Sequence, residues 1–283
     1  MKSHLKTKLR IGKISYTNCL PFFHGLFEQE PEGYEIHETY PSKINQLMNR
    51  GRVDIAPISS LEYLNHQKNY FLLPSLVIGS RDFSGSVLLL SKERIEGLGG
   101  SRIALSQESL SSATLLKILL KSKYKLSNTF QVCEASPQQM LKENIAALAI
   151  GDKALFYESK EFIYRYDLSE LWWNWTEKPF CFALWAVRKT FAKQYPSETS
   201  AFCKRLRNNL ERNLVDLETL IRSGLGLSFT DRRFSKIFGY LFNLSYGLDS
   251  EMREGLELFY RLAHRLEISP RAKPLEFFEE SCD

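Results

Sequence analysis

Small polar residues recur along this 283-residue chain wherever an apolar stretch ends or a helical pattern begins. They form five groups, which are Ser15 to Asn18, Ser59 with Ser60, Ser86, Ser109 with Ser111 and Ser112, and Asp152 after Gly151. The first turn of a helix leaves backbone N–H groups unpaired and carries partial positive charge, so hydroxyl and amide groups around it can bind a carboxylate or phosphate. Each group alone could equally be a helix cap. Five groups at equivalent places favour a nest of donors for an anion.

Asp152 is the one carboxylate among these groups. It follows the apolar run AALAI, so we expect it to be partly buried, where it could hydrogen-bond a ligand hydroxyl or transfer a proton. The alternative is that Asp152 only caps the turn that begins at Lys153.

Other catalytic signatures are missing from the sequence. No Walker loop, GxGxxG, HExxH or GxSxG motif is present, and the five histidines lie apart from one another and from the cysteines. The five cysteines are widely spaced without a CxxC pair, so they predict reduced thiols rather than disulfides or a zinc site. A metal enzyme or a Ser-His hydrolase is therefore not indicated.

An aromatic stretch, residues 167–185, holds all four tryptophans. Such a density of rings can stack on an unsaturated ligand or simply pack two lobes together. We expect Trp172 and Trp173 to pack in the core, and we expect Thr176, Pro179 and Phe180 to face a cleft.

The elements that must position these residues alternate between strand and helix. Short apolar runs such as VDIAPIS and AALAI alternate with helical patterns, which predicts an α/β protein with largely parallel sheets. Pro21 predicts the start of a helix that carries Phe22, Phe23, Leu26 and Phe27. Two such α/β units, separated by a polar break at residues 81–85, suggest two lobes with a ligand cleft between them.

Amphipathic helices are expected after residue 190, where apolar residues recur at intervals of three or four. The net charge of +5 is spread along the chain, which favours a small anionic ligand over nucleic acid. No apolar run is long enough to span a bilayer or to form the core of a signal peptide, so we expect a cytoplasmic protein without membrane insertion. The sequence does not indicate an oligomeric state.

A set of motifs in residues 9–190 resembles the chorismate dehydratase family of the futalosine route to menaquinone. The matching segments, in order, are GxISYxNxxP at Gly12, SSxEY at Ser59, SV at Ser86, SxSS at Ser109, IGDxAL at Ile150, and DL at Asp167 leading to Trp172, Thr176 and PFxFAxW at Pro179. Three positions depart from the family pattern. Thr17 replaces a usual leucine, Leu110 a common basic residue, and Glu177-Lys178 a usual glycine and apolar residue.

The resemblance implies a two-lobed fold like that of type 2 periplasmic binding proteins, with a cleft between the lobes and a helical C-terminal part. We expect residues 1–85 and 186–283 to form one lobe and residues 86–185 the other. The implied activity is loss of water from chorismate, a dicarboxylate, to give 3-[(1-carboxyvinyl)oxy]benzoate, a hydro-lyase reaction without metal or organic cofactor.

Under this hypothesis the Ser15 to Asn18 segment is a carboxylate cradle. Asn18 and Ser86 would hold one carboxylate, and Ser111 with Ser112 the other, while Ser60 and Asp152 would face the ring hydroxyl or the leaving water. The base is either Asp152 or the substrate's own side-chain carboxylate, and we favour the second. Two alternatives are the dihydroxynaphthoate-forming enzyme of the same pathway and a binding or sensory module that closes on an anion without altering it.

Overall fold

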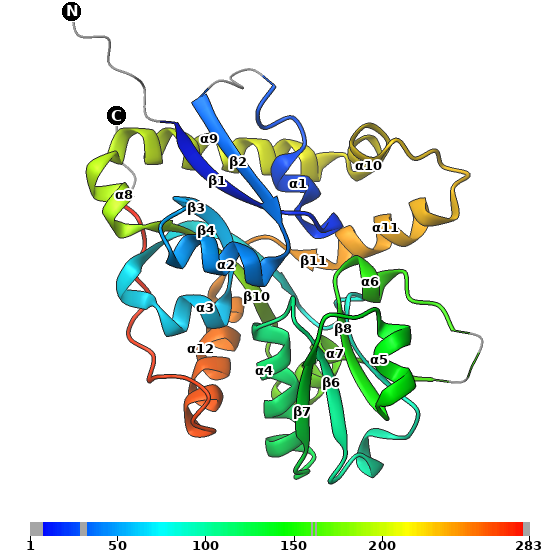
Figure 1. Ribbon diagram of the computed structural model, residues 1–283. Coiled ribbons are helices and arrows are strands. Elements are labelled where there is room, and N and C mark those ends of the chain that lie inside the picture. The colour runs from blue at the N-terminus through cyan, green and yellow to red at the C-terminus, as the bar shows by residue number, and fades with distance from the viewer. Residues whose placement is uncertain (1–7, 29–32, 160, 162, 280–283) are drawn as a thin grey trace, which may run out of the picture.

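Two β-sheets, each flanked by helices, make up the part of the chain that the computed structural model describes, which is residues 8–28, 33–159, 161 and 163–279 (Figure 1). The α/β class is confirmed. The six-stranded sheet occupies the upper part of Figure 1, and the five-stranded sheet occupies the lower right.

The six-stranded sheet has the strand order β11-β4-β10-β3-β1-β2. Its strands are β1 (Leu9–Ile14), β2 (Tyr34–Thr39), β3 (Ile55–Ser59), β4 (Tyr70–Ser80), β10 (Phe180–Arg188) and β11 (Leu244–Ser245). β1 runs parallel to β2 and β3, whereas β10 lies antiparallel between β3 and β4. β3 and β4, which follow one another in the chain, are thus separated in the sheet by β10, a strand from a much later segment.

The five-stranded sheet has the order β7-β6-β8-β5-β9. Its strands are β5 (Val87–Ser91), β6 (Arg102–Ser106), β7 (Thr129–Cys133), β8 (Ala146–Ile150) and β9 (Tyr164–Asp167). β6 is parallel to β7 and β8, but β5 is antiparallel to β8 and β9. Both sheets are therefore mixed, and the expectation of largely parallel sheets is wrong. The reason is that β5 and β10 each enter their sheet from the other lobe, rather than by a crossover connection from a strand of the same sheet.

Three strands, β3, β5 and β8, are buried along their whole length, as expected for strands covered on both faces. The helices that connect strands in this part of the chain are α2 (Pro41–Asn49), α3 (Ser60–Asn65), α4 (Ser111–Ile118), α5 (Pro137–Glu143), α6 (Asp152–Leu155) and α7 (Leu168–Thr176). Local signals start several of them: Pro41 stands in the first turn of α2, and Ser136 with Gln139 forms a capping box at α5.

The chain passes twice between the sheets, at residues 81–86 and again between α7 and β10. The buried carboxylate of Asp167 fixes the first crossing, because it accepts hydrogen bonds from the Ser84 hydroxyl at 2.8 Å and the Gly85 N–H at 2.6 Å. The expected boundary at 185 falls inside β10, all of which pairs in the six-stranded sheet. The return crossing therefore precedes Phe180, and we propose that the second lobe ends there.

The helix expected after Pro21 is short. A 3-10 turn, Thr17–Cys19, leads into α1 (Leu20–Phe23), and the helix does not extend to Phe27 as expected. It ends because His24 is extended and Gly25 takes a left-handed φ of 75°.

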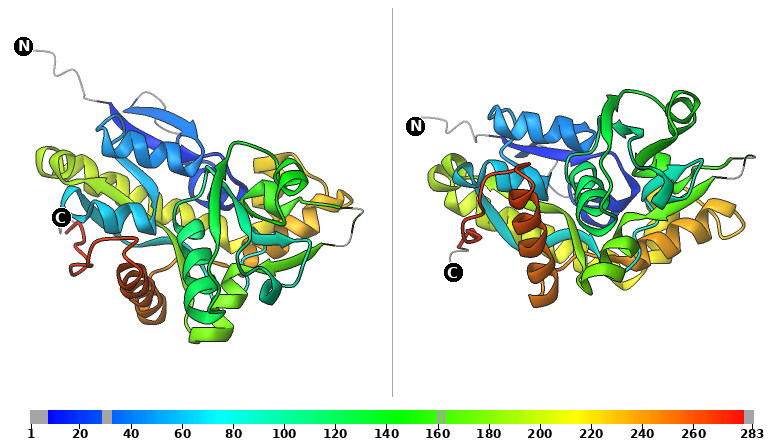
Figure 2. Two further views of the ribbon diagram at one scale, coloured as in Figure 1. Left: turned by 60° about the horizontal axis from the view of Figure 1, so that its bottom comes forward. Right: turned by 90° about the horizontal axis from the view of Figure 1, so that it is seen from below.

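Within the described residues, five helices follow β10, in agreement with the helical region that the apolar pattern predicts. They are α8 (Lys189–Gln194), α9 (Pro196–Val215), α10 (Leu217–Leu225), α11 (Arg232–Asn243) and α12 (Ser250–Arg265). In the two further views of Figure 2, the green segment with the five-stranded sheet stays together as one body, while the blue N-terminal strands and the red C-terminal helix lie on the other side.

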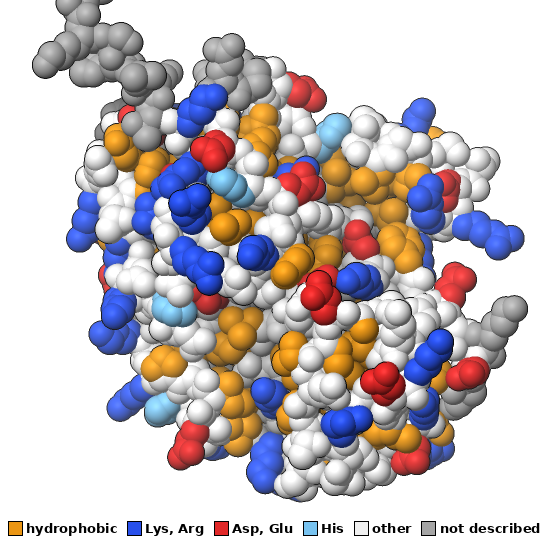
Figure 3. All heavy atoms as spheres, viewed as in Figure 1, with side chains coloured by type: hydrophobic (Ala, Val, Ile, Leu, Met, Phe, Trp, Pro, Cys, Tyr) orange, Lys and Arg blue, Asp and Glu red, His pale blue; other side chains and the backbone are white. Residues whose placement is uncertain are grey.

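Among the described residues, no helix combines the length and apolar character needed to cross a bilayer. Figure 3 shows one face of the molecule, on which basic and acidic side chains are intermixed rather than segregated.

Candidate active site

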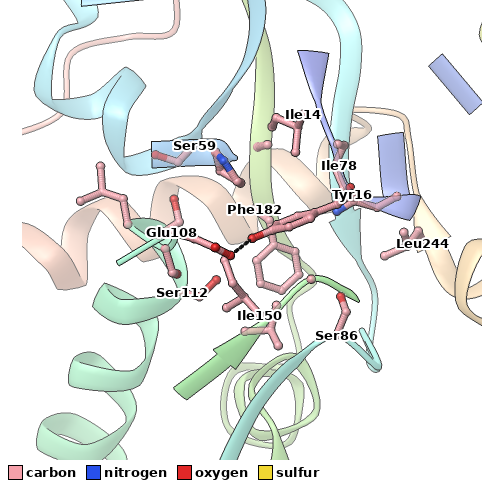
Figure 4. A pocket seen from close by; sticks show the side chains of 18 residues that line it. Ile14, Tyr16, Ser59, Ile78, Ser86, Glu108, Ser112, Ile150, Phe182 and Leu244 are labelled. Atoms are coloured by element: carbon pink, nitrogen blue, oxygen red, sulfur yellow. Dashed lines mark hydrogen bonds between the residues drawn. The ribbon is translucent and has the colours of Figure 1, made fainter. Parts of the chain in front are cut away.

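A pocket lies between the two sheets, where strand ends from both meet (Figure 4). It encloses about 630 Å³ of empty space, including the open solvent at its mouth. Its polar lining comes from strand ends and helix starts of both lobes. The polar residues are Tyr16, Asn18, Ser59, Ser86, Glu108, Ser109, Ser111 and Ser112. Its apolar lining includes Ile14, Ile78, Ile150, Phe182 and Leu244.

Five of the residues predicted from sequence line this pocket together, namely Asn18, Ser86, Ser109, Ser111 and Ser112. Two of them carry buried polar atoms that have no hydrogen-bond partner among the described residues, the Asn18 Oδ1 and the Ser109 Oγ. A buried polar atom without a partner is costly, so these atoms are positioned for a group that binds in the pocket.

Ser60 does not line the pocket. Its hydroxyl lies 2.9 Å from the Ser111 Oγ, which also accepts a hydrogen bond from the Leu61 N–H at 3.0 Å. Ser111 therefore links the first turn of α3 to the first turn of α4. Ser111 does not cap its own helix, because the N-cap position of α4 is Leu110.

Asp152 lies behind the pocket wall, in an adjoining cavity that also contains Ser15. Its carboxylate accepts hydrogen bonds from the Thr17 N–H and the Thr17 hydroxyl, both at 3.1 Å. The sequence suggested that N–H groups at the start of the first helix could bind a substrate anion. The Thr17 N–H is instead bonded to the Asp152 carboxylate of the protein itself. Burial raises the pKa of Asp152, and the two bonds from Thr17 partly oppose that shift.

Thr176 and Ser15 lie away from the pocket. The Thr176 hydroxyl donates to the Trp172 carbonyl at 2.8 Å within α7, and the Ser15 side chain is exposed. The aromatic wall also differs from expectation. Phe180 is fully buried against Trp172, and Phe182 is the ring that reaches the pocket. A register shift between Cys181 and Ala183 explains this, because it interrupts the alternation that would otherwise place Phe180 and Phe182 on the same face of β10.

The sequence analysis placed Tyr16 in the Ser15 to Asn18 segment without a role of its own, and it missed Glu108; the two side chains point toward each other in Figure 4. The Tyr16 hydroxyl donates to Glu108 Oε2, and Lys153 donates to Glu108 Oε1 at 2.7 Å. The Tyr16 ring also packs on Gly151, where an added Cβ would lie 2.6 Å from the ring. Tyr16 follows β1 of one sheet, and the other residues follow strands of the second sheet, so this contact joins the lobes.

Protonation in this network is set by burial. The pKa of Tyr16 lies far above its ordinary value, first because the phenol is buried and then because it faces the Glu108 carboxylate. Tyr16 is therefore a neutral donor at any ordinary pH. The Glu108 charge is compensated by Lys153, so the pocket presents mainly neutral donors to a ligand.

Metal chemistry finds no support in the side chains. No group of three His, Cys, Asp or Glu residues suited to a metal ion occurs within the described ranges.

The pocket combines hydroxyl and amide groups at its edges with Phe182 and aliphatic side chains, an arrangement suited to an unsaturated ring that carries acidic groups.

Comparisons with known proteins agree with this geometry. The chain matches a family described as menaquinone biosynthesis over residues 9–265. It is 29% identical over 277 residues to a chorismate dehydratase of Thermus thermophilus, an alignment that covers 88% of this chain and 93% of that protein.

Solved structures identify the fold. A protein from Archaeoglobus fulgidus has a TM-score of 0.72 at 16% identity, with coverage of 94% of this chain and all of the other. The periplasmic aliphatic sulphonate binding protein of Escherichia coli has a TM-score of 0.58 at 16% identity, with coverage of 97% and 94%. The chain therefore has a periplasmic-binding-protein-like fold, as the sequence motifs implied.

Proposed function

The chain belongs to the menaquinone biosynthesis family, and from this premise we propose that it is a chorismate dehydratase. It eliminates water from chorismate to give 3-[(1-carboxyvinyl)oxy]benzoate, which makes it a carbon–oxygen lyase. The observation that carries the proposal is the pocket itself, in which polar groups from both lobes surround an aromatic and aliphatic floor.

Chorismate fits the character of this pocket. It has an unsaturated ring, a ring carboxylate, a ring hydroxyl and an enol ether that ends in a second carboxylate. The ring packs on Phe182 and the aliphatic residues around it. The unpartnered Asn18 amide oxygen and Ser109 hydroxyl lie among the donors and acceptors that meet the polar groups of the substrate.

Two donors hold the enol-ether carboxylate. Asn18 follows β1 and Ser86 precedes β5, and both reach the pocket from opposite lobes. Ser112, on the first turn of α4, serves the ring carboxylate together with the partial positive charge of that helix end.

The reaction removes the hydrogen from the ring carbon that bears the enol ether. The electron pair of that C–H bond becomes a ring double bond, the neighbouring C–O bond breaks, and the departing hydroxyl with a proton becomes water. The ring becomes aromatic, so the protein contributes mainly orientation and charge stabilisation.

The base is the enol-ether carboxylate of the substrate. Among the described residues that line the pocket, Glu108 is the one carboxylate, and its two oxygens are engaged by Tyr16 and Lys153. Asp152 lies in the adjoining cavity and is bonded to Thr17. Fixing the substrate carboxylate with Asn18 and Ser86 is therefore the protein's contribution to the proton transfer.

The test is to incubate purified protein with chorismate and follow the products by liquid chromatography and mass spectrometry. We expect a product lighter by one water with a benzoate absorbance. Asn18→Ala and Ser86→Ala should each lower kcat/KM by about a hundredfold, whereas Ser228→Ala, at an exposed position, serves as the matched control. Unchanged chorismate in the presence of folded wild-type protein would overturn the proposal.

A further inference from the structure

Tyr240 stands directly behind the polar edge of the pocket. It belongs to α11, in a part of the chain for which the sequence motifs assign no site residue, and it is 4% exposed. It does not line the pocket, but its hydroxyl reaches two residues that do.

Ser86 and Asn18 share this one phenol. The Ser86 Oγ donates to the Tyr240 hydroxyl oxygen at 3.0 Å, across 154 positions of the chain. The Asn18 side chain also hydrogen-bonds the same hydroxyl, while its Oδ1 is buried without a partner among the described residues. The two side chains assigned to one carboxylate are thus fixed relative to each other by a third group.

A serine hydroxyl has only one proton, so Ser86 cannot donate to the Tyr240 hydroxyl and to a substrate carboxylate at the same time. Ser86 can donate to a carboxylate only if this bond reverses, so that Tyr240 donates to the Ser86 Oγ. Such a chain, from Tyr240 to Ser86 to the carboxylate, strengthens each bond in it, because every donor is polarised by the next.

Tyr240 is suited to this role because it remains a neutral hydroxyl. Burial, opposed by the bonds from Ser86 and Asn18, raises its pKa above the ordinary value for tyrosine. It therefore keeps its proton available for donation across the range in which the protein is folded.

We propose that Tyr240 is a positioning residue for the dehydration, which sets the proton direction of Ser86 and the orientation of the Asn18 amide toward the substrate carboxylate. This inference rests on the proposed function. It assigns a part in the reaction to the C-terminal helical region, which otherwise serves as packing.

The test is a double-mutant cycle with Tyr240→Phe, Ser86→Ala and the double variant, assayed for kcat and KM with chorismate. Tyr240→Phe keeps the buried ring and removes only the hydroxyl, and we expect kcat/KM to fall about tenfold. The same change in the Ser86→Ala background should lower kcat/KM by clearly less than tenfold, because only the part that acts through Asn18 remains; an undiminished tenfold loss would overturn the action through Ser86. Tyr63→Phe is the matched control, because it removes a buried tyrosine hydroxyl that bonds the Glu276 N–H away from the pocket.

The outcomes separate the two proposals. If wild-type protein binds chorismate in a calorimeter but leaves it unchanged, the proposed dehydratase activity is wrong. The role of Tyr240 in that reaction is then wrong as well. An active wild type with an unaffected Tyr240→Phe variant overturns only the role of Tyr240. Equal losses in Tyr240→Phe and Tyr63→Phe, in step with their melting temperatures, also overturn it, because they indicate a general loss of packing.

Discussion

The Tyr16 hydroxyl donates a hydrogen bond to the Glu108 carboxylate, which joins two residues 92 positions apart and on opposite sides of the pocket. With the Tyr16 ring against Gly151 and the Thr17 N–H on Asp152, this bond holds the segment after β1 to the second lobe. It acts as a latch between the lobes, in addition to the contacts of Ser111 with α3 and of Ser86 with Tyr240.

Removal of the latch should weaken substrate binding more than turnover. Tyr16→Phe keeps the ring on Gly151 and loses the bond to Glu108, so we expect KM for chorismate to rise about tenfold with a smaller change in kcat. Steady-state kinetics on Tyr16→Phe, Glu108→Ala and the double variant measure this. If the pair acts as a unit, the double variant is no worse than the more impaired single variant. Wild-type KM values in both single variants contradict the latch.

Replacement of Asp152 should have a modest effect on catalysis. Asp152→Asn retains an oxygen that can accept the Thr17 N–H, and it removes a charge that is unfavourable in this buried position, as the raised pKa of the carboxyl indicates. We expect kcat within about tenfold of the wild-type value. A loss of a thousandfold or more in a variant of unchanged melting temperature would identify Asp152 as the base.

Asp54 should make the free energy of unfolding depend on pH in the acid range. Burial acts to raise the pKa of Asp54, but hydrogen bonds from Arg10 and Arg188 at 2.6 to 2.9 Å outweigh it, and the net shift is downward. A folded-state pKa below the unfolded value of about 3.9 contributes stability above that pH, which is lost as pH falls toward the folded-state pKa.

The measurement is urea unfolding of wild type and Asp54→Asn from pH 7 to pH 3. At pH 7 we expect the variant to be less stable by about 2 kcal/mol, because two arginines lose their shared partner. The difference should shrink below about pH 4. The control is Glu257→Gln in the exposed pair with Arg253, which should change stability little. A difference that does not vary with pH refutes the assignment.

Glu177 occupies a position where glycine should be more stable. It ends α7 with a left-handed φ of 54°, which explains why the family pattern has glycine at this place. We expect Glu177→Gly to stabilise the protein by about 0.5–1 kcal/mol. Glu170→Gly, the same change inside α7, should instead destabilise it by about 1 kcal/mol. Thermal unfolding of both variants measures the effect, and a loss of stability in Glu177→Gly contradicts this account.

Much of the pocket follows from local sequence. Asn18, Ser86 and Ser112 reach it because strand ends and helix starts from two α/β units must meet at the same edge. Ser15 and Asp152 belong to the same segments but lie in the adjoining cavity, since neighbouring residues in a chain point in different directions. Proximity in sequence identified the edge of the pocket but not which side chains face it.

The rest depends on pairings over long distances in the chain. The contacts between Tyr16 and Glu108 and between Ser86 and Tyr240 form only after both lobes and α11 have packed. A polar residue beside a serine-rich turn gives no local sign of its partner. The antiparallel pairing of β10 likewise cannot be predicted from the sequence, because its apolar run is compatible with a parallel or an antiparallel strand.

The position of β10 between β3 and β4 also sets an order for synthesis. While the ribosome has made only the first half of the chain, β3 and β4 have no strand between them, and each exposes backbone groups along an open edge. The five-stranded sheet, in contrast, draws all its strands from residues 87–167 and can close as soon as they emerge. We therefore expect the lobe whose synthesis begins first to be the last to finish folding, because its sheet lacks β10 until residue 188 has emerged and β11 until residue 245 has emerged.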